Sequence, residues 1–198
     1  MGLDSVTLIV DVERHFGISI SNQEAERIYT VQDFADCIFS RVILHPDQKC
    51  KSQILFYKCR EFLTEKLGVR REDISPGTKL NQLIPVSDLK SVWTSIQLHF
   101  LIKLPDLSRL DFDPNASTEV TFFDLKVWTR KKPVTTGTVG DLVNWMLSLN
   151  HEKFLNPRNL CDKSDIERIV SGIISESCGV PIDEIRLHHR ITDDLGID

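Results

Sequence analysis

The stretch GVPIDEIRLHHRITDDLGID, residues 179–198, decides the fold because an earlier stretch of the chain repeats its pattern. Residues 68–80, GVRREDISPGTKL, match it at a constant offset of 111 residues. The matching positions are Gly68, Val69, Glu72 to Ile74 and Leu80 against Gly179, Val180, Asp183 to Ile185 and Ile191. In both copies the glycine stands where an amphipathic helix ends, so we expect an internal repeat.

Apolar periodicity predicts helices on both sides of these stretches. Thr30 with Asp33 and Thr138 with Asp141 have the spacing of a helix-capping box, so a helix is expected to start at each threonine. The pattern of 106–136 leaves a short strand and a packed loop open. The expected helices cover 3–16, ended by Gly17, with the stripe Leu3, Val6, Ile9, Val12 and Phe16; a short turn at 23–28; 54–67, ended by Gly68; 88–104, closed by Pro105; and 166–178, ended by Gly179.

The repeat unit is a long helix, a looping segment, a helix, a short turn and a further helix. The middle copy, 52–150, is complete and includes an irregular insertion. The first copy, 1–44, lacks the first helix, whereas the last copy, 160–198, has only that helix and its loop. The sequence therefore predicts an all-α protein with two four-helix modules, one of which is formed from both ends of the chain.

The distribution of charge supports this division. The formal net charge of the 198 residues is -5, but residues 1–40 and 160–198 each carry a net charge of -5 and the segment between them carries +5. The two ends thus resemble each other in charge and differ from the middle.

Composition and spacing exclude several classes of protein. No apolar run approaches the roughly 20 residues that cross a bilayer, and no signal peptide precedes the first acidic residue, so a cytoplasmic protein is expected. The five cysteines form no CxxC pair and are interpreted as reduced thiols. The basic run 130–132 is too short to indicate a nucleic-acid partner.

Side-chain patterns give no reason to expect an enzyme or a metal site. No Ser-His-Asp arrangement, phosphate-binding glycine loop or HExxH motif is present. His188 and His189 with Asp193 and Asp194 are interpreted as a solvated loop, and His15 with Asp11 as a surface pair. Trp93, Trp128 and Trp145 are interpreted as core or partner-contact residues of the middle module.

Both ends of the chain resemble the acyl carrier proteins, small acidic four-helix bundles that carry acyl chains on a phosphopantetheine arm. Residues 3–33 resemble the second, third and fourth helices of that family, and residues 166–198 resemble its first helix and long loop. Joined tail to head, the ends read as one carrier domain in inverted order. A circular permutation and a slice through a tandem array both explain this order, and the halves could close within one chain or as a domain-swapped dimer.

The resemblance implies that 4'-phosphopantetheine is attached to the serine of an Asp-Ser-Leu motif at the start of the second helix, where a helix N-terminus favours a phosphate. The motif around Asp4 nominates Ser5 as the cofactor-binding residue. The helix register, counted back from Phe16, instead places the attachment position at Gly2, with Asp198 as the preceding aspartate. We favour the helix register because it aligns the helix without a gap. The break at this position favours the hypothesis that the natural protein has a serine there and that Met1-Gly2 is an introduced start.

The resemblance also implies the function and the partners. A carrier of this kind presents an acyl group to enzymes of fatty-acid, lipid or polyketide type and is loaded by a phosphopantetheinyl transferase. Asp11, Glu13, Glu24 and Glu26 would steer basic partners to it. The middle module has Asp88 where the serine would stand, so no arm is expected there. The alternative is an arm-free interaction or scaffold module that keeps the fold without the chemistry.

Overall fold

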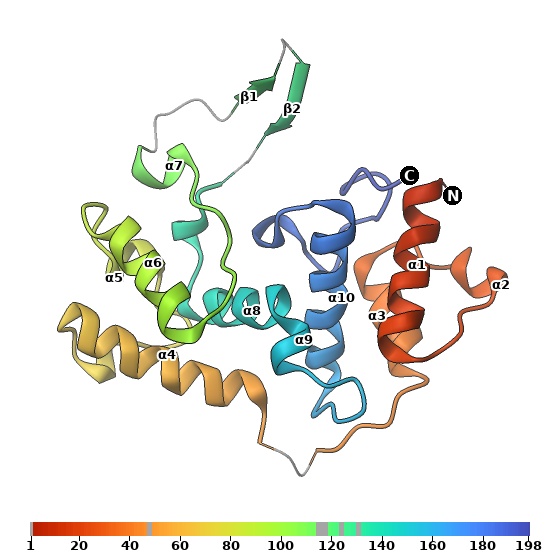
Figure 1. Ribbon diagram of the computed structural model, residues 1–198, viewed down its shortest axis with the longest axis horizontal. Helices are drawn as coiled ribbons and strands as arrows, with labels where there is room; N and C mark the ends of the chain where they lie inside the picture. Colours follow the sequence, from red (N-terminus) through yellow and green to blue (C-terminus); the bar gives the residue numbers. More distant parts are fainter. Residues whose placement is uncertain (1, 47–48, 114–118, 123–124, 130–131) are drawn as a thin grey trace. The chain divides into compact units, whose positions relative to one another are not determined.

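The computed structural model describes residues 2–46, 49–113, 119–122, 125–129 and 132–198 (Figure 1). This part of the chain is mainly helical, as the sequence predicts, and it includes one two-stranded antiparallel sheet. None of its helices combines the length and apolarity that crossing a membrane requires. The helices are α1 Leu3–Phe16, α2 Asn22–Ala25, α3 Val31–Phe39, α4 Lys51–Leu67, α5 Leu80–Leu83, α6 Leu89–Phe100, α7 Arg109–Phe112, α8 Val139–Leu149, α9 His151–Phe154 and α10 Lys163–Cys178; the 3-10 turns are η1 Arg71–Asp73, η2 Val134–Thr136 and η3 Ile182–Glu184; and the strands are β1 Glu119–Phe122 and β2 Leu125–Thr129.

The chain divides into two compact units. Unit 1 combines both chain ends, Met1–Ile54 and Asn144–Asp198, and unit 2 is Leu55–Val143. This division falls within α8, whereas the domain bounds expected from the sequence, 1–44 with 160–198 and 52–150, remain predictions.

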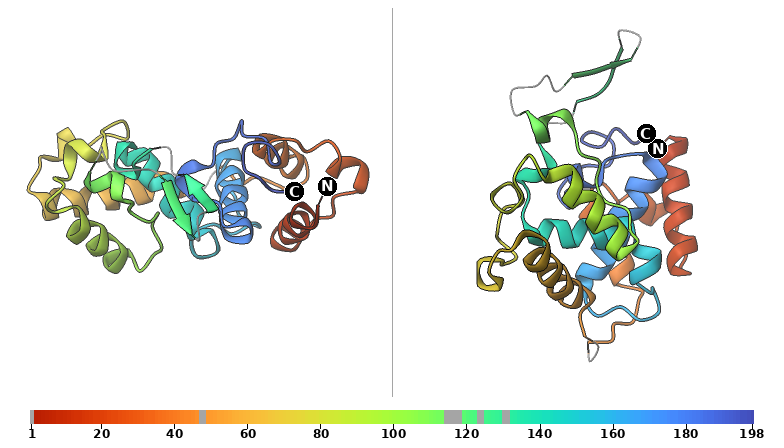
Figure 2. Two further views of the ribbon diagram at one scale, coloured as in Figure 1. Left: turned by 90° about the horizontal axis from the view of Figure 1, so that it is seen from above. Right: turned by 60° about the vertical axis from the view of Figure 1, so that its left-hand side comes forward.

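In unit 1, α10 packs against both α1 and α3 (Figures 1 and 2). Its buried face consists of aliphatic residues, among them Ile166, Ile169, Val170 and Ile174, each fully shielded from solvent. At the end of α10 the Ser177 hydroxyl donates to the Asp11 carboxylate of α1 at 2.7 Å. Helix α10, from the last repeat copy, therefore forms a core with α1 and α3, from the first copy.

Backbone hydrogen bonds join the C-terminal loop to the start of α3. The Ile191 amide donates to the Tyr29 carbonyl at 2.9 Å, and the Val31 amide donates to the His189 carbonyl at 3.1 Å. Thr30 and Arg190 form an isolated antiparallel bridge between these bonds. The loop is thereby fixed against the N-terminal half of the unit, and the marks for the two chain ends lie side by side in every view of the ribbon (Figures 1 and 2).

Unit 2 contains the same hydrogen-bonding arrangement. The Leu80 amide donates to the Gly137 carbonyl at 2.9 Å, the Val139 amide donates to the Thr78 carbonyl at 2.9 Å, and Lys79 bridges Thr138. The 3-10 turns η1 and η3 also stand at equivalent positions in the two repeat copies. The repeat read from the sequence is thus a repeat of local structure in each unit.

Helix boundaries follow the sequence signals where a cap is present. Gly17 and Gly179 end α1 and α10 in the left-handed conformation, with φ of 65° and 69°. The capping box of Thr30 and Asp33 is formed at the start of α3. These confirmed ends are those at which a single residue type has a strong conformational preference.

The predicted end of α6 and the predicted buried stripe of α1 both differ from the structure. The expected helix 88–104 ends at Phe100, because Leu101 adopts the left-handed conformation with φ 53° and the Ile102 amide donates back to the Gln97 carbonyl at 3.1 Å. This turn directs Ile102 and Leu104 into the core, where they are 9% and 6% exposed. The stripe predicted for 3–16 is buried only in part.

Within the open pattern of 106–136, the described residues form α7, two paired strands and η2. Strands β1 and β2 pair antiparallel, with an irregularity in register between Val120 and Thr121. The carboxylate of Asp111 in α7 is buried and accepts hydrogen bonds from both the amide and the hydroxyl of Thr135, at 2.9 and 3.0 Å. The insertion in the middle copy is therefore anchored at its base by a satisfied buried carboxylate.

Gly172 of α10 lies close to the backbone at the end of α8, and its replacement tests this packing. A Cβ atom at Gly172 would lie 2.1 Å from the Ser148 carbonyl oxygen and 2.6 Å from Nδ1 of His151. Gly172→Ala is expected to destabilise the protein by about 1–3 kcal/mol through overpacking, despite the higher helix propensity of alanine. Chemical denaturation measures the change, with Gly77→Ala as the control because its Cβ would meet only the Ser75 hydroxyl oxygen, at 3.9 Å. An unchanged Gly172→Ala midpoint would contradict the close approach.

Candidate functional site

The N-terminus of α1 lies directly against the C-terminal residue. Gly2 is the N-cap of α1, and a Cβ atom added to it would lie 2.3 Å from the Asp198 carbonyl carbon. The Ser5 amide, one of the first-turn donors that have no partner within the helix, donates to an Asp198 oxygen at 2.9 Å. In space the order is therefore Asp198, Gly2, Leu3.

Ser5 lies in the first turn of α1 and is half-buried. Its hydroxyl donates to the Gly2 carbonyl at 2.9 Å, a local bond that satisfies the donor within the helix. Ser5 and Gly2, the two positions between which the sequence leaves the attachment open, are thus neighbours at one helix end. Of the two, Ser5 alone has a hydroxyl group.

A cavity of about 330 Å³ opens beside this helix end. Its volume falls at the lower end of the range for small-molecule pockets. The inner wall is apolar, since Leu8, Phe34 and Ile197 are each at most 2% exposed, and the mouth carries polar groups. The lining residues come from three segments: Gly2, Ser5, Leu8 and Ile9 from α1; Ala25, Glu26, Ile28, Tyr29 and Phe34 from α2, the loop after it and α3; and Ile191, Thr192, Ile197 and Asp198 from the C-terminal loop.

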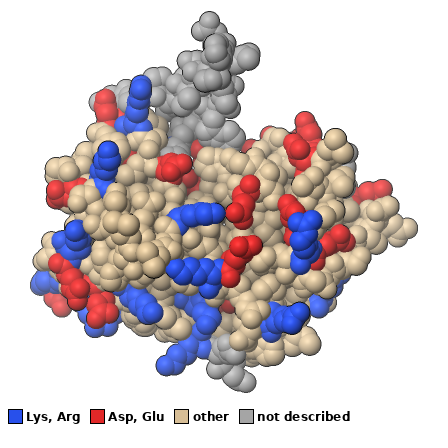
Figure 3. All heavy atoms as spheres, in the orientation of Figure 1, with Lys and Arg blue, Asp and Glu red and all other residues tan. Residues whose placement is uncertain are grey.

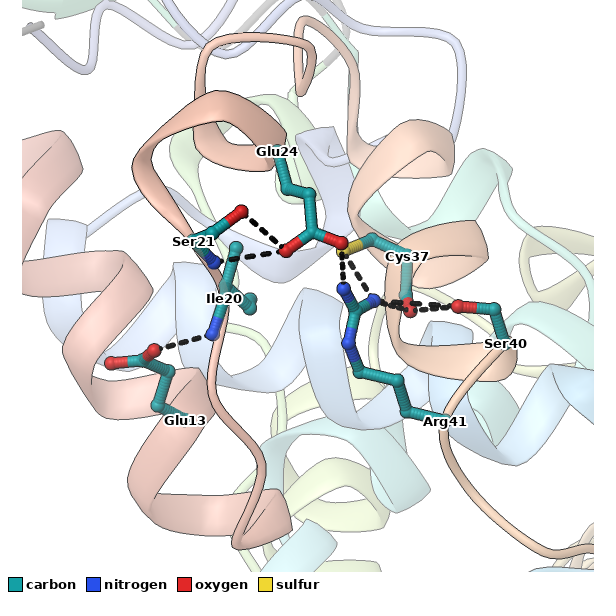
Figure 4. Close-up of polar contacts among 7 residues, drawn as sticks. All are labelled: Glu13, Ile20, Ser21, Glu24, Cys37, Ser40 and Arg41. Atoms are coloured by element: carbon teal, nitrogen blue, oxygen red, sulfur yellow. Dashed lines mark hydrogen bonds and ion pairs between the residues drawn. The ribbon is translucent and has the colours of Figure 1, made fainter.

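A polar network fixes α2 at the rim of the cavity (Figure 4). The Glu24 carboxylate accepts from the amide and hydroxyl of Ser21, at 2.9 and 2.7 Å, and pairs with Arg41 from beyond α3. The Glu13 carboxylate of α1 accepts from the Ile20 amide at 2.6 Å. The hydrogen bonds from Ser21, followed by the charge of Arg41, lower the pKa of Glu24 below its usual value. Carboxylates from α1 and α2 therefore hold the neighbouring residues Ile20 and Ser21 at the start of α2.

The outer face of α1 beside the cavity is apolar and exposed. Leu3 is 85% exposed, and Val6 and Val10 lie on the same side of the helix at 46% and 42%. Spacings of three and four residues place them in one stripe along the helix. The sequence predicted an apolar stripe here, but only Leu8 and Val12 of α1 are buried, so the face from Leu3 to Val10 is available to a partner.

Three of the four acidic residues expected to steer partners make contacts within unit 1. Asp11 and Glu13 bond within unit 1, and Glu24 is engaged by Ser21 and Arg41, whereas Glu26 is exposed at the cavity rim. On the face drawn in Figure 3, acidic and basic side chains lie interspersed rather than in a patch of one sign. Most of these acids are therefore committed to holding the fold.

Three patterns noted in the sequence have separate outcomes. The expected surface pair of His15 with Asp11 is wrong, because Asp11 bonds Arg14 and Ser177 while the His15 ring contacts His151. Asp193 and Asp194 near the histidine pair both bond Arg190. The basic run includes residues 130 and 131, which lie outside the described residues.

Comparison with known proteins gives one partial similarity. No protein-family model matches the chain, and no solved structure matches it. The acyl carrier protein of Thermosynechococcus vestitus (strain NIES-2133 / IAM M-273 / BP-1) is 50% identical to it over 40 residues. Part of the chain is similar to an acyl carrier protein. The similarity covers 20% of this chain and 49% of the relative, so the chain spans about half of the relative's length.

Unit 2 differs from unit 1 in the residue at the equivalent helix end. Asp88 is the N-cap of α6, as Gly2 is of α1, and its side chain carries no hydroxyl. Tyr29 and Ile197, which line the cavity of unit 1, were not singled out from the sequence. They are ordinary apolar positions until the two chain ends meet, so no local signal identifies them.

The Glu24 network predicts a pH-dependent contribution to stability. Because folding lowers the pKa of Glu24, the ionised carboxylate stabilises the fold above its unfolded pKa, about 4.3, and this contribution is lost as the pH falls through the folded value. Glu24→Gln is therefore expected to lower the urea midpoint at pH 7, and its difference from the unchanged protein should be smaller at pH 3. Glu26→Gln, an exposed glutamate in the next turn, is the control. An equal loss at both pH values would contradict the role of the charge.

Proposed function

We propose that unit 1 is an acyl-carrier-type module whose attachment position is the N-cap of α1, position 2. In this role the protein presents an acyl group to acyl-transferring enzymes and catalyses no reaction itself. The observation that carries the proposal is the contact of Asp198 with Gly2 at the N-terminus of α1, beside an apolar cavity. The partial similarity to an acyl carrier protein supports the same role.

The helix end suits a phosphate ester. The first-turn amides and the dipole of α1, a helix of 14 residues, favour a negative charge at this end. A phosphopantetheine arm attached here would supply the thiol that carries the acyl group. The cavity, with Leu8, Phe34 and Ile197 in its wall, provides a water-excluding surface for the apolar part of such a group.

Attachment needs a hydroxyl group, and the two candidate positions differ in how they meet this need. Gly2 stands at the proposed attachment position but has no hydroxyl. A serine is therefore needed at position 2 for the phosphopantetheine arm to be attached there. Ser5 has the hydroxyl, but it is half-buried and donates to the Gly2 carbonyl. We propose that Ser5 does not replace a serine at position 2.

The partner surface in this proposal is the exposed stripe of α1. This stripe begins at Leu3, next to position 2, and continues through Val6 and Val10. Glu26 is exposed and lines the cavity. An apolar centre flanked by an acid fits an enzyme surface with an apolar depression and a basic rim. The other three acids considered from the sequence contribute to the fold rather than to this surface.

The absence of a hydroxyl at Gly2 favours a second function, that of an interaction module without an arm. Without a hydroxyl at position 2, the printed chain would keep the fold and the α1 surface but carry no arm. It would then act as an interaction module that competes for, or assembles with, the enzymes that recognise carriers. The two functions differ in whether a serine at position 2 is modified.

Treatment with a phosphopantetheinyl transferase and coenzyme A, followed by intact mass measurement, tests the attachment position. We expect the printed chain to remain unmodified, and Gly2→Ser to gain the mass of one arm once Asp198 shifts to admit the side chain. The double variant Gly2→Ser/Ser5→Ala should gain the same mass. Gly2→Ser/Ser87→Ala is the control for unit 2 and should also be loaded once.

Two other results of the mass measurement would contradict the proposal. An arm on the printed chain that Ser5→Ala abolishes would show that Ser5 is the attachment residue and that the helix register is wrong. Absence of an arm from every folded variant would reject the carrier role and leave the interaction module. Circular dichroism of each variant establishes that it is folded.

A further inference from the structure

We propose that unit 1 binds a divalent transition-metal ion, with Zn²⁺ as the fitting ion, between the end of α1 and the start of α9. The ligands are His15, His151 and Glu152. One potential ligand atom from each of them lies within 4.8 Å of the others. This binding site is separate from the proposed carrier function and does not depend on it.

The ring nitrogens of the two histidines are suited to metal binding. Nδ1 of His151 lies 2.9 Å from the Ser148 carbonyl oxygen. A carbonyl only accepts hydrogen bonds, so Nδ1 carries the proton and Nε2 keeps a free lone pair. A histidine that donates its other N–H to a backbone carbonyl is the usual arrangement in metal sites, because the bond orients the ring.

His15 supplies an independent observation. Its Nε2 atom is buried and has no hydrogen-bond partner among the described residues. A buried polar atom without a partner is costly, and a metal ion would satisfy it. The His15 ring contacts the His151 ring, with centroids 4.9 Å apart.

The third ligand and the helix end complete the site. Tetrahedral zinc with bonds of about 2.0–2.1 Å places its ligand atoms about 3.3 Å apart, so the cluster must close slightly. Glu152 is exposed and its side chain can make this movement. His15 lies in the last turn of α1, where the carbonyl ends of the helix favour a cation.

Three protein ligands of nitrogen and oxygen type select the class of ion. Two imidazoles and one carboxylate suit zinc and its neighbours in the first transition row better than Mg²⁺ or Ca²⁺, which prefer oxygen ligands. A fourth position would remain for water. The site stands at the opposite end of α1 from Gly2, about 20 Å away at 1.5 Å per residue, so each can be altered without the other.

Zinc titration of the untagged chain against a chromophoric chelator tests the proposal. We expect one Zn²⁺ per chain, a visible Co²⁺ spectrum of tetrahedral type, and at least tenfold weaker binding in both His15→Ala and Glu152→Gln. His188→Ala is the matched control, because it removes an exposed histidine from the other histidine pair of unit 1 and should bind zinc unchanged.

Glu152→Gln keeps the test decisive, since replacing an exposed side chain should leave the fold intact, as circular dichroism would verify. Zinc should also raise the melting temperature of the unchanged protein more than that of Glu152→Gln. The proposal is overturned by the absence of saturable binding, by binding that either His15→Ala or Glu152→Gln leaves intact, or by an equal loss in His188→Ala.

Discussion

Backbone hydrogen bonds between the C-terminal loop and the N-terminal half hold unit 1 together. The Ile191 and Val31 bonds fix the loop to the start of α3, and the Ser5 amide then donates to an Asp198 oxygen at the start of α1. Because backbone groups that leave water need partners, these bonds determine where the last residues of the chain can lie. The cavity and the close approach of Asp198 to Gly2 both depend on that placement.

The same constraint explains why one pattern serves both units. In each unit, a left-handed glycine ends the long helix and a 3-10 turn follows. The loop then pairs with the threonine that precedes the next helix, Thr30 or Thr138. The next residue of the loop, Ile191 or Leu80, is aliphatic and buried in the core. Unit 2 keeps this framework with Asp88 at the helix end where unit 1 has Gly2. The framework therefore forms with different residues at this helix N-cap.

Sequence reasoning succeeded where one residue has a strong local preference. Gly17, Gly179 and Thr30 marked helix ends correctly because left-handed backbone and side-chain capping depend on few neighbours. It failed for the end of α6, where burial of Ile102 overrides continued helical periodicity. It could not bring His15 to His151 or enclose the cavity, because both depend on residues far apart in the chain that meet only after packing.

The central claim is that the two ends of one chain form a single module in which Asp198 adjoins the first turn of α1. Nuclear Overhauser contacts, measured in a mixture of labelled and unlabelled chains, test it most directly because they separate contacts within a chain from contacts between chains. The account predicts a contact between the Ser5 amide proton and Asp198 within the same chain. Its absence, or its appearance only between different chains, would contradict the account.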